Sequence, residues 1–175
     1  MLSLKKVSKS FGGVKAVDGC TFEVKENTIT SLIGPNGAGK TSVFNIISGL
    51  TRPDSGAIRL LGKDIAGMPP YKISQSGISR TFQITKVFRN MTIKDNLLIA
   101  KKTAEGEMKK VLESVYLSKP LDTIASELSY GQQRLLELAR ALLKSHHLLM
   151  LDEPTAGVNP RIRQELKIIL KNLRK

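Results

Sequence analysis

The chain has 175 residues, of which 41% are hydrophobic and 25% charged, a composition typical of one globular domain with a substantial core. Its formal net charge is +13, but the basic residues are spread along the chain without a basic tail or an alternating aromatic pattern, so we expect no nucleic-acid partner. No apolar run approaches the roughly 20 residues of a membrane span, and the N-terminus lacks a signal-peptide core. With a single cysteine, Cys20, which we expect to be a small buried residue, these features predict a cytoplasmic protein.

The first part of the sequence predicts strands, tight turns and one helix. Residues 1–33 are typical of strands, with turns at 11–13 and 18–19, and the apolar run 29–33 predicts a buried strand. Apolar residues at helical spacing predict a helix over residues 39–50.

The rest of the sequence alternates strands and helices. We expect a turn at 53–56, a strand over 57–61, a short helix that begins at Pro69 and Pro70 and ends at Gly77, and a strand over 78–83. Helical structure is expected over 92–117, where Thr92 and Asp95 form a capping box at its start. A helix over 129–144, a buried strand over 147–151 and a last helix from Pro160 follow. This order predicts an α/β fold with an antiparallel β part and a helical insertion.

A phosphate-binding loop is the most specific motif. The eight residues 34–41 match the pattern G-x-x-x-x-G-K-S/T, between a predicted strand and a predicted helix. Glycines let backbone N–H groups approach phosphate oxygens, and the helix N-terminus adds a partial positive charge. Lys40 would face the β- and γ-phosphates, and the Thr41 hydroxyl would bind Mg²⁺. The predicted nucleotide-binding residues of this segment are Gly34, Pro35, Asn36, Gly37, Ala38, Gly39, Lys40, Thr41 and Ser42.

Two carboxylates end a predicted buried strand. Asp152 could hold Mg²⁺ through oxygen, and Glu153, which points differently, could polarise an attacking water as a general base. Many buried strands end in an acidic residue, so the pattern gains its weight from the phosphate loop earlier in the chain.

The segment 128–133 predicts a capped helix start. Ser129 and Gln132 complete a capping box. The segment is then either an ordinary helix beginning or a second anion-binding helix N-terminus.

Four motifs, in their order along the chain, resemble the nucleotide-binding domain of ATP-binding cassette (ABC) ATPases over essentially the whole chain: 34–41, Gln83, 128–133 and 148–153. The segments 11–13, 78–83, 91–97 and 156–160 resemble those of the ATPases of branched-chain amino-acid importers. The resemblance implies one domain over 1–175, with a β part and phosphate-loop core over 1–83, a helical subdomain over 84–135 and a return to the core over 136–175.

The resemblance also implies roles and partners. Phe11 would stack on adenine, although the residue alone could equally be a core phenylalanine. Gln83 would reach Mg²⁺ and the attacking water, and Ser129, Gly131 and Gln132 would contact ATP bound by a second ATPase subunit, in a homodimer or heterodimer. Permease subunits in the membrane would bind the protein at the inner face of the cell membrane. The apolar residues Val87, Phe88 and Met91 predict a docking neighbourhood, with Phe88 partly exposed.

The sequence departs from the family at three places. Tyr130 replaces a usual glycine, and Asn159 replaces a usual aspartate, which favours the branched-chain group. The family's switch histidine follows the Asp152–Glu153 strand, whereas His146 and His147 precede it, as strand-entry residues. We therefore expect the C-terminal strands to be missing and hydrolysis to be slow. The function expected is MgATP hydrolysis that powers an importer; alternatives are a soluble ABC-fold ATPase without a membrane partner and a nucleotide-binding module with impaired hydrolysis.

Overall fold

The structure is a computed structural model that describes residues 1–82 and 86–173. The chain contacts divide it into two compact units, a first unit of Met1–Ile78 and a second unit of Ser79–Lys175. Within the described ranges, no helix is long and apolar enough to cross a membrane. Gln83 lies outside the described residues.

An antiparallel sheet forms the first unit's β part. It contains β1 (Leu2–Phe11), β2 (Val14–Val24), β3 (Ser55–Leu60) and β4 (Lys63–Asp64), in the order β2-β1-β3-β4. Buried residues alternate along the paired strands, and Leu2 faces Leu60 while Leu4 faces Ile58. Such cross-strand apolar pairs are the unit of stabilisation of a sheet, and they confirm the predicted antiparallel part.

The turns of the β1–β2 hairpin were predicted with mixed success. Gly12 and Gly13 join the strands and both have positive φ, of 51° and 84°, which fits the tight turn that a right-twisted hairpin needs. The turn predicted at Asp18–Gly19 is wrong, because both residues lie inside β2. Gly19 has a φ of 59° and lies where the register between β1 and β2 shifts. The glycine therefore allows the irregular backbone conformation at this point of the strand. Cys20, on the same strand, is half-buried rather than buried, and burial raises the pKa of its thiol.

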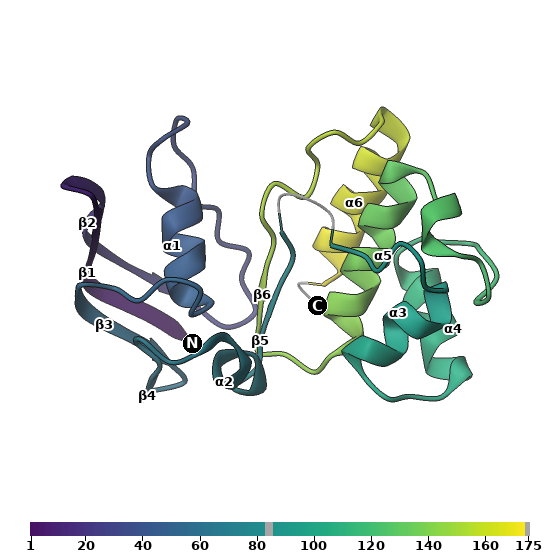
Figure 1. The fold of residues 1–175 in the computed structure, drawn as a ribbon, viewed down its shortest axis with the longest axis horizontal. Helices are drawn as coiled ribbons and strands as arrows, with labels where there is room; N and C mark the ends of the chain where they lie inside the picture. The colour runs from purple at the N-terminus through teal and green to yellow at the C-terminus, as the bar shows by residue number, and fades with distance from the viewer. Residues whose placement is uncertain (83–85, 174–175) are drawn as a thin grey trace. The chain divides into compact units, whose positions relative to one another are not determined.

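Two helices complete the first unit. Helix α1 (Lys40–Ile47) buries Val43, Ile46 and Ile47, and Figure 1 shows it beside β2. It ends before the predicted residue 50, because Gly49 has a φ of 75° and a left-handed glycine terminates a helix. Gly49 is also needed for space, since a side chain there would meet the Met68 carbonyl. Helix α2 (Pro70–Gln75) begins and ends as predicted, with Gly77 at a φ of 91°.

The buried strand predicted over residues 29–33 is wrong. This segment has no strand assignment, and Ile29 and Ile33 are 60% and 89% exposed. A strand needs a neighbour that pairs its backbone N–H and C=O groups. A short apolar run predicts burial, but it does not say which segment would supply that neighbour.

Helices dominate the second unit. They are α3 (Ile93–Ala100), α4 (Glu105–Ser114), a short 3₁₀ turn η1 (Ala125–Glu127), α5 (Tyr130–Leu143) and α6 (Pro160–Asn172). Figure 1 shows α5 among the other helices of this unit. One apolar cluster joins them, with contributions from every α-helix, including Leu97, Met108, Leu135, Leu136 and Leu166. The predicted caps are confirmed: Thr92 and Asp95 form one capping box, and Ser129 and Gln132 form another.

The helical stretch predicted over 92–117 is two helices. The chain extends at Lys101, where φ is −157°, and helix α4 starts after Ala104. Glu105 and Glu107 lie in the first turn of α4, where the helix dipole favours negative charge. Thr103 and Lys101 both hydrogen-bond Glu107 and lower its pKa, the lysine most. The acidic pair therefore marks a second helix start that apolar periodicity alone does not reveal.

A small parallel sheet leads to Asp152 and Glu153. Strands β5 (Ile78–Arg80) and β6 (Leu148–Met150) pair with each other, and both are shorter than the predicted strands. The Thr81 N–H continues the pairing to the Met150 carbonyl at 3.0 Å. The end of β6 and the segment after β5 therefore lie together, which positions Asp152 next to residues that follow Ile78.

Candidate functional site

The phosphate loop has the conformation that its glycines require. Gly37 and Gly39 have φ values of 83° and 81°, in the left-handed region that side chains disfavour. A Cβ on Gly39 would lie 2.1 Å from the Ala16 carbonyl oxygen of β2, so this position also needs glycine for space. The Ala38 N–H closes a turn onto the Pro35 carbonyl at 3.2 Å.

Lys40 is folded over its own loop. Its ammonium donates to the carbonyls of Gly34 and Pro35, at 2.7 and 2.8 Å. The charge therefore lies at the loop whose glycines expose backbone groups, at the N-terminal end of α1. An anionic phosphate here would meet both a full positive charge and the partial charge of a helix terminus.

Thr41 and Ser42 follow in the first turn of α1. The Thr41 residue is exposed and Ser42 half-exposed. A hydroxyl at this position is an oxygen donor that suits Mg²⁺. The predicted nucleotide-binding residues 34–42 thus lie in one loop and at the start of one helix.

Phe11 is a surface aromatic. It ends β1 with 50% of its surface exposed, and the Lys9 ammonium lies 5.4 Å from its ring centroid. The alternative of a core phenylalanine is therefore wrong. An exposed ring beside a lysine is available for stacking on a planar ligand, so the adenine contact remains a prediction.

The two carboxylates after β6 lie in different environments. Asp152 is largely buried, and its Oδ2 atom accepts a hydrogen bond from the Arg80 guanidinium at 3.1 Å. Burial lowers the pKa of Arg80, and the contact with Asp152 opposes that shift. Glu153 is exposed and has a φ of 46°, an uncommon backbone conformation for a glutamate. Such outliers gather at functional sites, and the difference between the neighbours supports two different roles.

The segment 128–133 begins α5 as a capped helix. The Ser129 hydroxyl accepts from the Gln132 N–H at 3.3 Å, and the Ser129 N–H donates to the Gln132 side chain at 3.0 Å. Gly131 is buried, and a Cβ there would lie 3.1 Å from the Ile162 side chain of α6. The structural role of these residues is thus established, and the contact with a second subunit's ATP stays a prediction.

Tyr130, which replaces a usual glycine of the family pattern, lies on the surface. It is 46% exposed, and a Cβ on Gly157 would approach its ring to 3.1 Å. The Arg134 guanidinium lies 5.6 Å from the ring centroid. The tyrosine therefore packs over a glycine without disturbing the cap of Ser129.

A largely buried polar cluster on α5 was not predicted from the sequence. Glu137 accepts hydrogen bonds from the backbone N–H groups of Phe82 and Lys86 at 3.2 and 3.5 Å. Arg134 pairs with Glu137 at 3.1 Å and donates to the Phe82 carbonyl at 2.5 Å. Arg140 donates to the Lys86 carbonyl at 2.5 Å, and burial lowers its pKa. We call these three side chains the α5 clamp, because they hold the backbone on both sides of residues 83–85.

A signal for the α5 clamp exists in the sequence. Charged residues recur at spacings of three, at positions 134, 137 and 140, with only apolar residues between them. Long charged side chains on a buried helix face need partners. Spacing alone places Arg134 beside Glu137, but it does not identify the distant backbone groups that they hold.

The predicted Mg²⁺ ligands offer a suitable donor chemistry. Thr41 and Asp152 carry a hydroxyl and a carboxylate, the oxygen donors that Mg²⁺ prefers. Gln83, the third predicted ligand, lies outside the described residues. Within the described residues, no three His, Cys, Asp or Glu side chains are grouped as a metal site.

Comparisons with known proteins identify the family. The model of the ABC transporter family matches residues 17–156, so the chain belongs to this family and is an ATPase of the ABC type. It is 39% identical to the high-affinity branched-chain amino acid transport ATP-binding protein BraF of Pseudomonas aeruginosa, over 99% of this chain and 77% of the relative. It is 42% identical to a probable branched-chain amino acid transport ATP-binding protein, LivG, of Archaeoglobus fulgidus, over 91% of this chain and 70% of the relative.

Solved structures agree with this assignment. A nucleotide-free ATP-binding cassette from an ABC transporter has a TM-score of 0.89 and 33% identity, and covers 99% of this chain and 76% of its own. A second structure, an ATP-binding cassette in its ADP conformation, also has a TM-score of 0.89, with 34% identity and the same coverage. The predicted ABC ATPase fold is confirmed.

Proposed function

We propose that this chain is the ATP-hydrolysing subunit of a membrane importer whose substrates are branched-chain amino acids. The proposal of ATP hydrolysis rests on the phosphate loop. In this loop, Lys40 and a backbone conformation that requires glycine lie at the start of α1. The substrate class rests on the similarity to transport proteins of that named class. As an importer subunit it would lie at the cytoplasmic face of the membrane.

The residues divide the work of ATP hydrolysis. The phosphate loop binds the phosphates, and Lys40 neutralises their charge. Thr41 and Asp152 would hold Mg²⁺, which when bound neutralises phosphate charge. Glu153 accepts a proton from the attacking water as general base, Gln83 aligns that water, and Phe11 stacks on adenine. Ser129, Gly131 and Gln132 complete the site of a second ATPase subunit.

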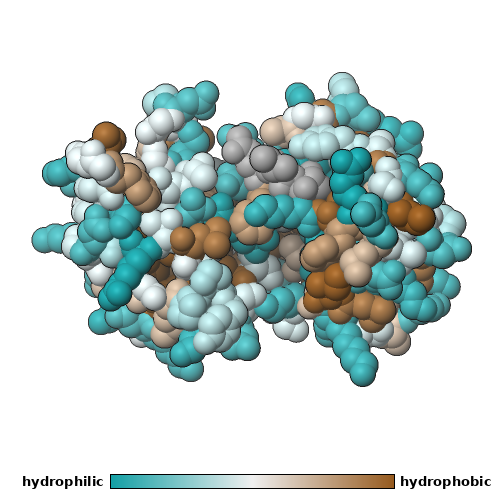
Figure 2. All heavy atoms as spheres, in the orientation of Figure 1, coloured by the Kyte–Doolittle hydropathy of each residue, from teal (hydrophilic) through white to brown (hydrophobic). Residues whose placement is uncertain are grey.

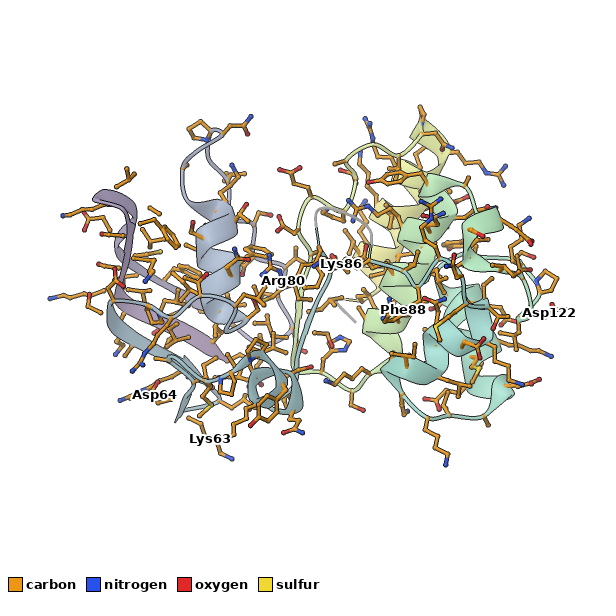
Figure 3. The ribbon with its side chains drawn as sticks, viewed as in Figure 1. Lys63, Asp64, Arg80, Lys86, Phe88 and Asp122 are labelled. Carbon is orange, nitrogen blue, oxygen red and sulfur yellow. The ribbon has the colours of Figure 1, made fainter. Side chains whose placement is uncertain are left out.

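Lys40→Ala should weaken ATP binding at least tenfold, which corresponds to about 1.4 kcal/mol. The variant removes the ammonium that now bonds the Gly34 and Pro35 carbonyls. Calorimetric titration with ATP measures the effect. Lys63→Ala is the matched control, because Lys63 is an exposed lysine of edge strand β4 (Figure 3). Equal affinity of Lys40→Ala and the parent would contradict the assignment of the loop.

We also propose that permease subunits dock beside Phe88 and Met91. These residues are 44% and 40% exposed, as predicted for Phe88, while Val87 is half-buried against the core. Figure 2 shows apolar side chains gathered in the second unit around α3, the helix that follows Met91. Exposed apolar groups of this kind indicate a partner surface.

Phe88→Ser should reduce assembly with the permease and leave ATP affinity unchanged. Buried Asn96 holds the backbone of Phe88 with hydrogen bonds of 2.9 and 3.0 Å, so the loop should survive loss of the ring. Co-purification with permease subunits co-expressed from the same transporter measures assembly. Tyr71→Ser removes an exposed ring, 61% accessible, from α2 and serves as control. If Phe88→Ser assembles as well as Tyr71→Ser, the docking surface lies elsewhere.

A further inference from the structure

Arg80 contacts the carboxylate that we assign to Mg²⁺. It is the last residue of β5, and Asp152 follows the end of β6, the strand paired with β5. The two side chains meet through Arg80 Nη2 and Asp152 Oδ2 at 3.1 Å. Figure 3 labels Arg80 at β5. The contact thus joins two segments that are 72 residues apart in sequence.

Stability alone does not account for this ion pair. The Arg80 and Asp152 side chains are only 7% and 13% exposed, and removing two charges from water costs about as much as their attraction returns. An apolar pair of similar volume would hold the strand ends at least as well. The guanidinium is instead fixed in place, since it also lies 4.9 Å from the Phe82 ring centroid.

The geometry leaves part of the carboxylate available. The hydrogen bond uses Oδ2, and within the described residues no hydrogen bond to Oδ1 is found. The side chain keeps a small exposed fraction, 13%. One oxygen is therefore held, while the other can face a cation or a water bound to it.

We propose that Arg80 is a positioning residue for Asp152, which holds the carboxylate in the orientation that Mg²⁺ binding needs. This inference rests on the proposed function, because it assumes that Asp152 binds Mg²⁺. Carboxylates that bind metals are themselves hydrogen-bonded, and loss of such a partner typically costs about 10–100-fold in metal affinity. A competing possibility is that the guanidinium occupies the place of the cation, in which case its removal would strengthen Mg²⁺ binding.

The test is the Mg²⁺ dependence of ATP binding. Calorimetric ATP titrations of the full chain at a series of Mg²⁺ concentrations give the concentration of half-maximal effect. In Arg80→Met, which keeps an unbranched apolar side chain but loses the guanidinium, we expect this concentration to rise about tenfold or more. ATP affinity in EDTA and the far-UV circular dichroism should stay as in the parent. An unchanged or lowered Mg²⁺ requirement would overturn the inference.

Further variants separate positioning from other effects. Arg80→Lys keeps the charge but loses the planar donor group, so its effect should be smaller than that of Arg80→Met; it also replaces Arg80→Met if that variant does not fold. In the Asp152→Asn background, Arg80→Met should add no further shift, because both act on one ligand. An independent, additive shift would contradict a role through Asp152.

The same series distinguishes this inference from the proposed function. If Asp152→Asn alone leaves the Mg²⁺ dependence unchanged, Asp152 does not serve the cation and the proposed metal role fails. If Asp152→Asn raises the Mg²⁺ requirement while Arg80→Met and Arg80→Lys do not, the metal role stands and the positioning role of Arg80 is wrong.

Discussion

Glu153→Gln should lower the rate of ATP hydrolysis by about 10²-fold or more, the usual contribution of a general base. Glutamine keeps the volume and can still accept hydrogen bonds, but it does not take up a proton from water. Because Glu153 is exposed and its carboxylate is not part of the core, the fold and the affinity for ATP should remain. The ATP-bound form should therefore persist longer than in the parent.

Phosphate release under single-turnover conditions, with protein in excess over ATP, measures this rate even when turnover is slow. Calorimetry on the same samples reports ATP affinity. Glu23→Gln, at an exposed position of β2, makes the same chemical change away from the site. If Glu153→Gln releases phosphate as fast as Glu23→Gln, another group is the base.

The acidic pair illustrates what the sequence could predict. Residue type and position at the end of an apolar strand suffice to expect Asp152 and Glu153 at a sheet edge, and the structure places them after β6. The prediction that the two side chains point differently agrees with their different exposure. The Arg80 contact could not be predicted, because it depends on which strand pairs with β6.

The phosphate loop shows the same division between local and distant information. The glycine positions and the helix that follows them are local features, and α1 starts at Lys40, one residue after the predicted start. The two capping boxes elsewhere in the chain are also local, and they were predicted correctly. The strand expected over 29–33 failed, because strand formation depends on a distant partner that an apolar run does not specify. The choice between a core residue and a ligand contact for Phe11 could not be made for a related reason. Burial of one aromatic residue depends on what packs over it, and half of the surface of Phe11 is exposed.

The α5 clamp is the least predictable part of the second unit and should have a large energetic effect. Arg134 and Glu137 have side chains only 3% and 7% exposed, and Glu137 also accepts from the N–H groups of Phe82 and Lys86. Glu137→Ala leaves a buried guanidinium without this carboxylate and two backbone donors without their acceptor. Breaking a buried pair by removing one partner typically costs about 3–5 kcal/mol. We expect the free energy of unfolding of the second unit to fall by that amount.

Urea unfolding followed by far-UV circular dichroism measures this loss, because helices dominate the second unit. Arg161→Ala is the matched control: it breaks the Arg161–Glu165 pair, in which the arginine side chain is 88% exposed, and should cost less than about 1 kcal/mol. The double variant Arg134→Met with Glu137→Leu should be less destabilised than the sum of its single variants, because no buried charge of the pair remains unmatched. If Glu137→Ala costs no more than Arg161→Ala, the α5 clamp does not hold the segment around residues 82 and 86, and its hydrogen bonds contribute little to the second unit.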